Sequence, residues 1–594
     1  MKKSKIIDDN LILPEGTEFI NTLLRLYKHN LISRIYREAH EKDTLSLINI
    51  LLKVLNISIE IPGKYLNNIP DKGPFIAASN HPFRGIDSMI LFKLIFSKRP
   101  DIKILGSHML HEIEPLRDII IPVRTFEQAP SEGSSYAGIR QALSHLSSGC
   151  CLGIFPAAED SKYYTIPGLI IDSQWNPSAI KLIKRAGVPV VPVYFHGSLP
   201  RLRYLARIIN PLINKPLLPA ELVKKKKRNI SVRIGSAITI KEQDEITDPD
   251  VYGRYLRARV YSLSASVTHG KKTKIFKVKP AKAPETVINH IDDNLLINEF
   301  NSVKADYELF STKNYSVLCA PAYIIPNIFR EIGRMREITF REVGEGTGKR
   351  IDIDRYDFYY QHLFIWDTDE NRLVGAYRLG KGKEIMSLYG IKGFYISSLF
   401  RVKKSFAPVL TESVELGRSF LVSDYQKKPI PLFLLWKGIM VFLLKHTEYR
   451  YLIGPVSISN DLTKYSKSLL VDFIQRWYFD EELAKNIKPR KEFVSRHDHA
   501  ADRMVIVERS EKDLDKIEKI IIDAEAGYRM PILLKKYLEI NGRIIGFNID
   551  PKFNNCLDGL LILDVYKTPA EFIAGLSREM NDPSILDRFN AGRR

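Results

Sequence analysis

The sequence predicts an α/β protein of two domains, and three observations support this fold class. Strand-like and helical segments alternate between residues 57 and 240, and the same alternation returns after residue 330. A segment rich in lysine and proline, residues 270–284, separates the two stretches. A chain of 594 residues also exceeds the size of one ordinary hydrophobic core. We therefore predict a first domain over residues 1–269, a basic linker over 270–294 and a second domain over 295–594.

The composition is globular and basic, with 45% hydrophobic residues, 27% charged residues and a formal net charge of +20. Such a charge favours an anionic partner, which could be nucleic acid, an anionic membrane surface or an acidic carrier protein. The lysines of the linker are not accompanied by a nucleic-acid-reading module with stacking aromatic residues, so we predict no nucleic-acid partner. The four cysteines fit neither a disulfide framework nor a metal site, which indicates a reducing compartment.

The sequence predicts a protein that lies on a membrane rather than across it. No apolar segment follows the N-terminal Met-Lys-Lys-Ser-Lys, so we expect no signal peptide. The longest apolar run, residues 430–444, is interrupted by Lys437 and predicts a buried helix. Residues 14–55 fit a packed helical cap and a basic membrane-facing helix equally well. Residues 200–228 mix arginines with apolar side chains and end in Lys224-Lys-Lys-Lys-Arg228, which favours an anionic lipid surface. We expect a peripheral location on the cytoplasmic side of the inner membrane.

The elements of the first domain follow one another in a regular order. We predict strands at residues 57–61, 75–79, 102–105, 119–123, 151–156, 188–194 and 230–240. We predict helices at residues 88–96, 137–146 and 177–186. Sheets of this kind bind their ligands beyond the carboxyl ends of the strands, so the residues that follow each strand are the candidates for a site.

The turn after the strand at residues 75–79 carries the clearest chemical motif, Asn80-His-Pro-Phe-Arg-Gly-Ile-Asp87. Asp87 is expected at a helix N-cap, where backbone donors hold its carboxylate. The turn is short enough for that carboxylate to reach one ring nitrogen of His81, which fixes the tautomer and leaves the other nitrogen as a base. The alternative is a surface histidine beside a capping aspartate. The motifs that follow along the chain favour the catalytic interpretation.

Four blocks in order resemble the glycerolipid (PlsC-like) acyltransferase family. They are Asn80-His-Pro with Asp87, Ile121-Pro-Val-Arg124, Ile154-Phe-Pro-Ala-Ala-Glu-Asp-Ser161 and Val190-Val-Pro-Val193. The resemblance implies a PlsC-like fold in which His81 and Asp87 deprotonate a hydroxyl acceptor that attacks an acyl thioester. We expect Arg124, Glu159 and Ser161, which lie in the second and third blocks, at the substrate-binding side.

Two departures from the family pattern bear on the acceptor. The spacing is His-x5-Asp with Gly85 in the turn, a form that resembles the ornithine-lipid branch, whereas His-x4-Asp is the widespread form. The third block lacks the arginine that would fork a phosphate, and carries Glu159 and Asp160 instead. This disfavours an acceptor that bears a phosphate and favours one with a cationic head group, although Glu159 could also simply cap a turn.

The second domain has the layout of a GNAT-type acyltransferase core. We predict a helix at residues 331–341, a loop at 345–348, a strand hairpin over 362–366 and 373–379, and then a helix through Trp436. Residues 295–565 resemble the ornithine N-acyltransferase (hemolysin-type) branch, which is itself similar to acyl-homoserine lactone synthases. The quoted residues are Glu415-Leu-Gly-Arg-Ser419, Gly454-Pro-Val-Ser-Ile-Ser-Asn460, Leu533-Leu-Lys-Lys-Tyr537, and Phe547, Asp550, Phe553 and Asp558.

This second resemblance implies the substrates of the second domain. The Gly-rich loop that cradles the pyrophosphate of coenzyme A is missing, so the implied acyl donor is acyl carrier protein, whose acidic surface suits a basic chain. On the acceptor side we predict Glu415 as a base or ammonium ligand and Arg418 as a fork for a carboxylate. Arg336 and Arg378, with Asp354 and Asp357, are further candidates, for which a structural salt bridge is the alternative. We expect His497-Asp-His499 to be a loop rather than a metal site.

Together the resemblances imply a bifunctional acyltransferase that makes an acyloxyacyl aminolipid of the ornithine-lipid type. The second domain would attach a 3-hydroxyacyl chain to the α-amine of an amino acid such as ornithine or glycine, and the first domain would esterify the hydroxyl of that chain. Both steps are thioester chemistry, so no metal or redox cofactor is expected. The alternative is a lysophospholipid (1-acylglycerol-phosphate type) acyltransferase with an accessory domain, against which the missing arginine of the third block weighs.

Overall fold

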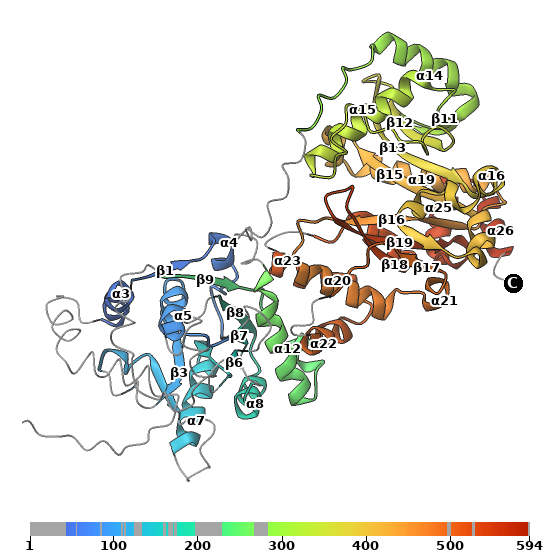
Figure 1. The fold of residues 1–594 in the computed structure, drawn as a ribbon. Coiled ribbons are helices and arrows are strands. Elements are labelled where there is room, and N and C mark those ends of the chain that lie inside the picture. The colour runs from blue at the N-terminus through green and yellow to red at the C-terminus, as the bar shows by residue number, and fades with distance from the viewer. Residues whose placement is uncertain are drawn as a thin grey trace, which may run out of the picture. The chain divides into compact units, whose positions relative to one another are not determined.

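The computed structural model describes residues 43–54, 56–83, 86–107, 111, 114–123, 134–157, 162–163, 170–171, 175–196, 228–265, 283–495, 500–525 and 529–591. The chain forms two compact units, each with its own α/β architecture (Figure 1). Unit 1 comprises Met1–Lys272 together with Arg496–Ser510 and Asp515–Gly527. Unit 2 comprises Thr273–Ser495, Glu511–Leu514 and Tyr528–Arg594. Two helices from late in the chain therefore belong to the same unit as its beginning.

Unit 1 is built on a seven-stranded sheet in the order β1-β9-β8-β2-β5-β3-β4. Its strands are β1 (Ile57–Glu60), β2 (Phe75–Ser79), β3 (Lys103–Ser107), β4 (Ile120–Val123), β5 (Cys151–Ile154), β8 (Val190–His196) and β9 (Arg228–Ile234). The strands from β8 to β4 run parallel, and β9 pairs antiparallel with β8. Every residue of β2 is buried, as expected for a central strand covered on both faces.

The helices of unit 1 cover this sheet. They are α3 (Thr44–Val54), α4 (Gly63–Leu66), α5 (Ile86–Phe96), α7 (Ser134–Ser147), α8 (Pro177–Ala186), α11 (Ile240–Asp244), α12 (Pro249–Ser262), α22 (Ala500–Ser510) and α23 (Leu514–Glu525), with a short hairpin of β6 (Lys162–Tyr163) and β7 (Ile170–Ile171). Phe75 and Ala77 of β2 share a core cluster with residues of α3 and α5. Helix α12 contacts β2 and β8, and α8 and α22 contact α12.

The ends of two elements show how well local chemistry predicts boundaries. The predicted helix at residues 177–186 is α8 itself, because Asn176 accepts a hydrogen bond from the Ser178 N–H (2.8 Å) and Gly187 ends the helix with a φ of 59°. The predicted strand at residues 230–240 is wrong at its end. Strand β9 stops at Ile234, and Thr239 caps α11 by accepting a hydrogen bond from the Glu242 N–H. Residues 14–42 and 200–227 lie outside the described residues.

Unit 2 is built on an eight-stranded sheet in the order β10-β11-β12-β13-β15-β16-β19-β18. Its strands are β10 (Glu308–Thr312), β11 (Tyr315–Pro321), β12 (Gln361–Asp367), β13 (Arg372–Lys381), β15 (Ser413–Leu421), β16 (Tyr451–Ile458), β18 (Arg543–Asp550) and β19 (Cys556–Asp564). Only the β15–β16 pair within this sheet is parallel, and its ladder covers just Ser413–Glu415 against Tyr451–Ile453. Both strands continue beyond that ladder without pairing with each other, which leaves a divergence in the middle of the sheet.

Helices pack around the sheet of unit 2. They are α14 (Asp293–Tyr307), α15 (Pro326–Glu342), α16 (Gly382–Tyr389), α17 (Ala407–Thr411), α18 (Ser423–Gln426), α19 (Pro429–Lys445), α20 (Lys464–Trp477), α21 (Glu481–Ala484), α24 (Ile532–Glu539), α25 (Ala570–Met580) and α26 (Ser584–Ala591). Helix α19 contains the longest apolar run and is largely buried, with Lys437 Nζ 4.8 Å from the centre of the Phe310 ring. Among the described residues, every helix is too short or too polar to cross a bilayer.

Candidate active sites

The turn between β2 and α5 brings His81 and Asp87 together. His81 lies just beyond the carboxyl end of β2, whose neighbours in the sheet are β5 and β8. Its Nδ1 atom is 2.9 Å from Oδ1 of Asp87, and the His81 side chain is 24% exposed whereas that of Asp87 is fully buried. A carboxylate at Nδ1 favours the tautomer in which Nε2 is the basic nitrogen. The pair therefore has the geometry predicted from the motif.

Backbone donors hold the Asp87 carboxylate, although not from the predicted N-cap position. Helix α5 begins at Ile86, so Asp87 lies within its first turn, and the N-cap prediction is wrong. The Phe83 N–H donates to Oδ2 of Asp87 (2.9 Å), and the Ser88 N–H lies 3.1 Å from Oδ1. The side chain thus spans the turn, which fixes it beside His81.

Two neighbours fix the surroundings of the histidine. Asn80 is buried, and its side chain joins β2 to β8 by donating to the carbonyl of Phe195 (3.0 Å) and accepting from the N–H of the same residue (2.8 Å). The ring of Phe155, at the end of β5, is centred 4.7 Å from the ring of His81. The sequence motif includes Asn80, but its role as a clamp depends on strand order. The predicted Arg124, Glu159 and Ser161 lie outside the described residues.

In unit 2, a buried network of ion pairs holds the loop that contains Asp352, Asp354 and Asp357. Arg336 on α15 donates to Oδ2 of Asp352 (3.0 Å) and to both oxygens of Asp357 (3.1 and 2.9 Å). Arg378 on β13 donates through Nη1 to Asp354 (2.9 Å) and Asp357 (3.1 Å). Burial alone would raise the pKa of Asp357, but the two guanidinium groups outweigh it and hold that pKa well below its usual range. Arg336 has the surroundings of a structural anchor.

Arg418 lies at the divergence of β15 and β16 and is less completely paired. Its φ is 54°, a left-handed conformation that side chains other than glycine seldom adopt, and the β13–β15 register shifts beside it. Its contacts with Asp352 (3.7 Å) and Asp354 (3.5 Å) are long. Nε of Arg418, and Nε and Nη2 of Arg378, are buried without a hydrogen-bond partner among the described residues. Backbone strain and unsatisfied donors of this kind are typical of functional sites.

Aromatic rings and a glycine surround these guanidinium groups. The ring centre of Tyr395 is 5.3 Å from Cζ of Arg378 and 5.4 Å from Cζ of Arg418, and the Phe553 ring is 4.3 Å from Cζ of Arg418. A Cβ atom at Gly417 would approach only Nη2 (3.9 Å) and Nε (4.0 Å) of Arg378 within 4 Å, apart from its chain neighbours. The missing side chain at Gly417 therefore leaves room beside the unpaired edge of Arg378.

Glu415 is completely enclosed. Its carboxylate accepts hydrogen bonds from the Tyr360 hydroxyl, from the Tyr395 N–H (2.9 Å) and from the Ile396 N–H (2.7 Å). Burial raises the pKa of Glu415 to about 7, although these donors act in the opposite direction. The contacts attach the short helix η4 (Tyr395–Ser398) to β15 and thereby fix Tyr395.

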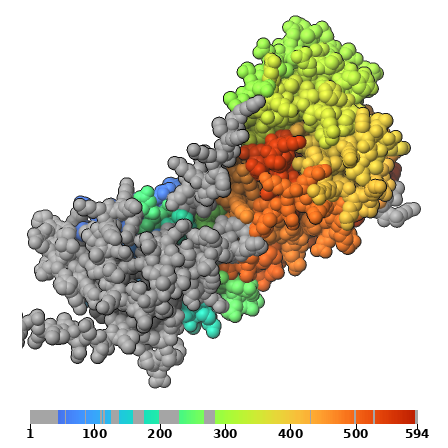
Figure 2. Space-filling model, viewed as in Figure 1, coloured from blue at the N-terminus to red at the C-terminus, as the bar shows by residue number. Residues whose placement is uncertain are grey.

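A second group of carboxylates lies on the strands beyond the divergence. Asp558 on β19 accepts a hydrogen bond from the Ser457 hydroxyl on β16 (2.8 Å) and is 3.5 Å from Sγ of Cys556. Burial raises the pKa of Asp558 to about 7, and the charges of Asp550 and Glu345 contribute in the same direction. In Figure 2, red surface from the last part of the chain lies between yellow-green and orange surface of the same unit.

Tyr395 lies within electrostatic reach of the guanidinium groups of Arg378 and Arg418 and of the carboxylates of Asp550 and Asp558. Burial raises the pKa of its phenol, and Asp550 and Asp558 raise it further, whereas Arg418 and Arg378 act against them. From the sequence, Asp558 is only one of the residues of the second resemblance and has no predicted catalytic role. The available signal was an acidic residue inside the otherwise apolar strand Cys556–Asp564, but the neighbours that shift its pKa come from other elements and could not be deduced.

Comparison with known protein families identifies the chemistry of both units. A model described as "Acyltransferase" matches residues 17–270, and a model described as "Acetyltransferase (GNAT) domain" matches residues 335–436. The chain carries two acyltransferase domains. The predicted fold class and the predicted enzyme class are confirmed. Within this two-domain acyltransferase, His81 and Asp87 fall in the first matched region, and Arg378, Glu415 and Arg418 fall in the second.

Relatives of the two-domain acyltransferase include one enzyme named for N-acylation and one named for O-acylation. A glycine N(alpha)-acyltransferase of Bacteroides thetaiotaomicron is 28% identical over 263 residues, which cover 40% of this chain and 74% of the relative. A lyso-glycine lipid O-acyltransferase of the same organism is 24% identical over 253 residues, which cover 41% of this chain and 89% of the relative.

Two solved structures are also similar to parts of the acyltransferase. The 1-acyl-sn-glycerophosphate acyltransferase PlsC of Thermotoga maritima is 15% identical, with a TM-score of 0.24 over 42% of this chain and 95% of its own. A CoA-dependent acyl-homoserine lactone synthase is 12% identical, with a TM-score of 0.24 over 46% of this chain and 97% of its own.

Proposed function

We propose that the two-domain acyltransferase makes an acyloxyacyl aminolipid in two steps. Unit 2 acylates the α-amine of an amino acid with a 3-hydroxyacyl chain, and unit 1 then acylates the hydroxyl of that chain. The observation that carries the proposal is the buried guanidinium edge of Arg378 beside Arg418, which has no hydrogen-bond partner among the described residues and lies inside the region that matches the GNAT model. The relatives named glycine N(alpha)-acyltransferase and lyso-glycine lipid O-acyltransferase support the two steps.

The carboxylate of the amino acid binds at Arg378 and Arg418. Guanidinium groups pair with carboxylates in a bidentate geometry, and a buried donor without a partner is costly until a ligand accepts its hydrogen bond. Gly417 leaves room for that ligand beside Nε and Nη2 of Arg378. The names of the relatives favour glycine over ornithine as the acceptor.

The amine of the acceptor faces Asp558, which acts as the general base. A carboxylate with a pKa of about 7 is suited to accept a proton near neutral pH. The amine nitrogen attacks the thioester carbonyl and forms a C–N bond while the C–S bond breaks. The proton passes from the nitrogen to Asp558 and from Asp558 to the departing thiolate. Glu415 acts as a positioning residue, because its two oxygens already accept three hydrogen bonds that fix Tyr395.

In unit 1, His81 takes the proton from the hydroxyl of the mono-acylated product. The hydroxyl oxygen then attacks a second acyl thioester and forms a C–O bond while the C–S bond breaks. Asp87, 2.9 Å from Nδ1, stabilises the imidazolium that forms, and the imidazolium returns the proton to the departing thiolate. We assign Arg124, Glu159 and Ser161 to the substrate side of this site, with Glu159 suited to a cationic head group. No phosphate on the acceptor is required.

Acyl carrier protein is the proposed donor for the amine-acylation step, and an anionic membrane surface is the proposed location. Both partners are acidic, and the formal net charge of the chain is +20.

Mass spectrometry of lipids tests the proposal. The chain is expressed in a bacterial host that makes no aminolipids, and the double variant His81→Ala/Arg418→Glu serves as the inactive control. We expect a new lipid with one amide-linked and one ester-linked acyl chain on an amino acid, absent with the control. New glycerophospholipid species without any acylated amino acid would instead support the lysophospholipid alternative.

A further inference from the structure

A helix pair from late in the chain is built into unit 1. Helices α22 and α23 cluster with residues 1–272, and α22 packs against α12. Neither family model covers this pair, since the matched regions are residues 17–270 and 335–436. Its contacts are therefore an addition to the matched acyltransferase domain.

A buried ion pair joins α12 to α22. The guanidinium of Arg257 forks the carboxylate of Asp502, with Nε 2.9 Å from Oδ2 and Nη2 3.0 Å from Oδ1. Asp502 is 2% exposed. A carboxylate so far from water is stable as an anion only while its partner is present.

A second carboxylate of the pair, Asp523 on α23, reaches the end of β9. It accepts hydrogen bonds from the N–H (3.1 Å) and the hydroxyl (2.7 Å) of Ser236, and its Oδ2 lies 3.6 Å from Nη2 of Arg259. Arg259 is itself buried and also pairs with Glu242 on α11 (2.6 Å). Asp523 thus belongs to the network that balances a buried cation of unit 1.

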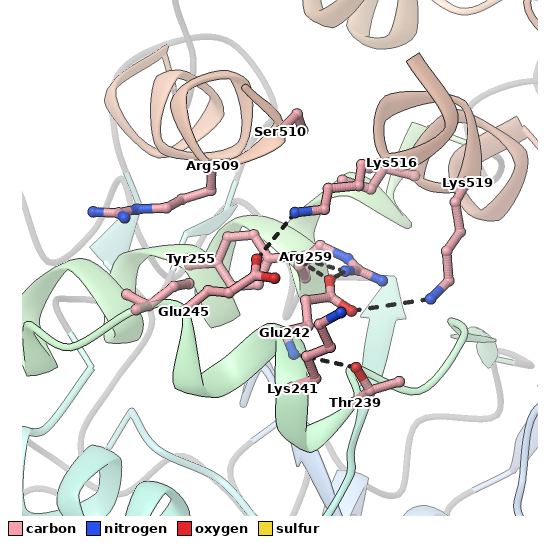
Figure 3. A pocket seen from close by; sticks show the side chains of 12 residues that line it. Thr239, Lys241, Glu242, Glu245, Tyr255, Arg259, Arg509, Ser510, Lys516 and Lys519 are labelled. Atoms are coloured by element: carbon pink, nitrogen blue, oxygen red, sulfur yellow. Dashed lines mark hydrogen bonds and ion pairs between the residues drawn. The ribbon is translucent and has the colours of Figure 1, made fainter. Parts of the chain in front are cut away.

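At the rim of this contact, lysines of α23 reach glutamates of α11 and the turn after it. Lys516 is 3.0 Å from Glu245, and Lys519 is 4.0 Å from Glu242 (Figure 3). These side chains line a cavity of about 200 Å³ between the two parts of unit 1. Several apolar side chains of the pair are fully buried. They are Ile506, Val507, Ile517, Ile521 and Ala524.

We propose that α22–α23 is an intramolecular partner that the N-terminal acyltransferase unit requires. The surface formed by α11, α12 and the end of β9 recognises it through buried carboxylates and apolar side chains. Without the pair, Arg257 and Arg259 would lose anionic partners. Without that surface, the buried carboxylates of Asp502 and Asp523 would lose these cationic partners. The N-terminal unit is therefore complete only in the presence of the chain that carries the second acyltransferase domain, and cleavage of the linker does not separate the two.

A nicked full-length chain tests this inference without reference to catalysis. A protease site is introduced between Lys271 and Pro284, the protein is cleaved, and native gel filtration is run. We expect the two fragments to co-elute. Arg257→Glu places a carboxylate against Asp502, so the same experiment should release the N-terminal fragment or aggregate it. Arg254→Glu, exposed on the same helix, is the matched control and should leave co-elution unchanged.

Thermal unfolding is the second measurement, and it tests the inference even if Arg257→Glu does not fold. Thermal unfolding of the nicked wild-type chain should show the N-terminal transition at the same temperature as in the intact chain. If the nicked wild-type fragments instead separate, and the N-terminal fragment alone keeps that transition, the inference is overturned. Because both readouts are structural, they leave the proposed two-step chemistry untested, and its failure would be seen only in the lipid analysis.

Discussion

Arg378 has almost no exposed surface, yet two of its nitrogens have no hydrogen-bond partner among the described residues. The substitution Gly417→Ala would place a methyl group 3.9–4.0 Å from those nitrogens, which is ordinary contact distance for the free protein. We expect the fold to persist and the KM for the amino acid to rise about tenfold or more, because the methyl group occupies the approach of the carboxylate. Steady-state kinetics and thermal melting measure this, with Gly575→Ala on α25 as the control, since its Cβ would meet nothing within 4 Å.

The second prediction at this scale concerns Asp558→Asn. Amine acylation should fall by about 10²–10⁴-fold, the usual contribution of a general base. The wild-type rate should decline as pH drops below about 7, because Asp558 then takes up a proton, and the variant should lack that dependence. Asp550→Asn removes only a neighbouring negative charge that helps to raise the pKa of Asp558, so it should keep most of the activity and move the decline in rate to lower pH. An unchanged pH profile in Asp558→Asn would contradict the assignment of the base.

Asp558→Asn should slow amine acylation, but the same substitution should stabilise the fold. Asp558 has a pKa of about 7 in the folded chain and a lower one when unfolded, so the native state binds the additional proton. Its ionisation therefore destabilises the fold as pH rises from about 4 towards 7. Asp558→Asn should consequently raise the melting temperature of unit 2 at neutral pH, which separates a catalytic defect from simple unfolding.

His81→Ala tests the division of labour between the two units. We expect O-acylation to be lost and N-acylation to remain, so that the mono-acylated aminolipid accumulates, because His81 belongs to the first matched domain only. Lipid mass spectrometry of cells that express the variant measures the ratio of the two products. Unchanged amounts of the di-acylated lipid would remove His81 from the mechanism.

At the scale of elements, apolar runs and caps predicted much of the fold. The helix at 177–186 and the buried helix over 430–444 follow from local sequence, and the His81–Asp87 contact follows from the length of one turn. Long-range features did not follow. The Arg257–Asp502 pair joins residues 245 positions apart, and the left-handed conformation of Arg418 depends on a register shift between two strands. Neither depends on the local composition that sequence reasoning uses.

The loop of residues 352–357 gives a prediction about one element. Arg336→Met keeps an unbranched apolar stem but removes the guanidinium, which leaves Asp352 and Asp357 buried with fewer partners. We expect the free energy of unfolding of unit 2 to fall by about 3–5 kcal/mol, the usual effect of removing one member of a buried ion pair. Urea denaturation measures it. Arg330→Met, exposed on the same helix, should change it by less than about 0.5 kcal/mol.

At the scale of the whole molecule, the excess of 89 basic over 69 acidic residues should determine where the enzyme works. Attraction to an anionic surface is screened by salt, with a Debye length of about 10 Å at 0.1 M and about 3 Å at 1 M. We expect the chain to co-sediment with vesicles of anionic lipid at low salt and to be released at high salt. It should not co-sediment with zwitterionic vesicles.

Matched charge removal separates a localised surface from net charge alone. One variant replaces the five cations Lys224, Lys225, Lys226, Lys227 and Arg228 by glutamine. The other replaces five of the six linker lysines by glutamine, namely Lys271, Lys272, Lys274, Lys277 and Lys279. The net charge falls equally in both. The first cluster follows the apolar residues interleaved with arginine at 200–209, so its loss should weaken vesicle binding more, at about 1 kcal/mol for each cation near the surface. Equal weakening in the two variants would show that binding depends on total charge and would remove residues 200–228 from the membrane contact.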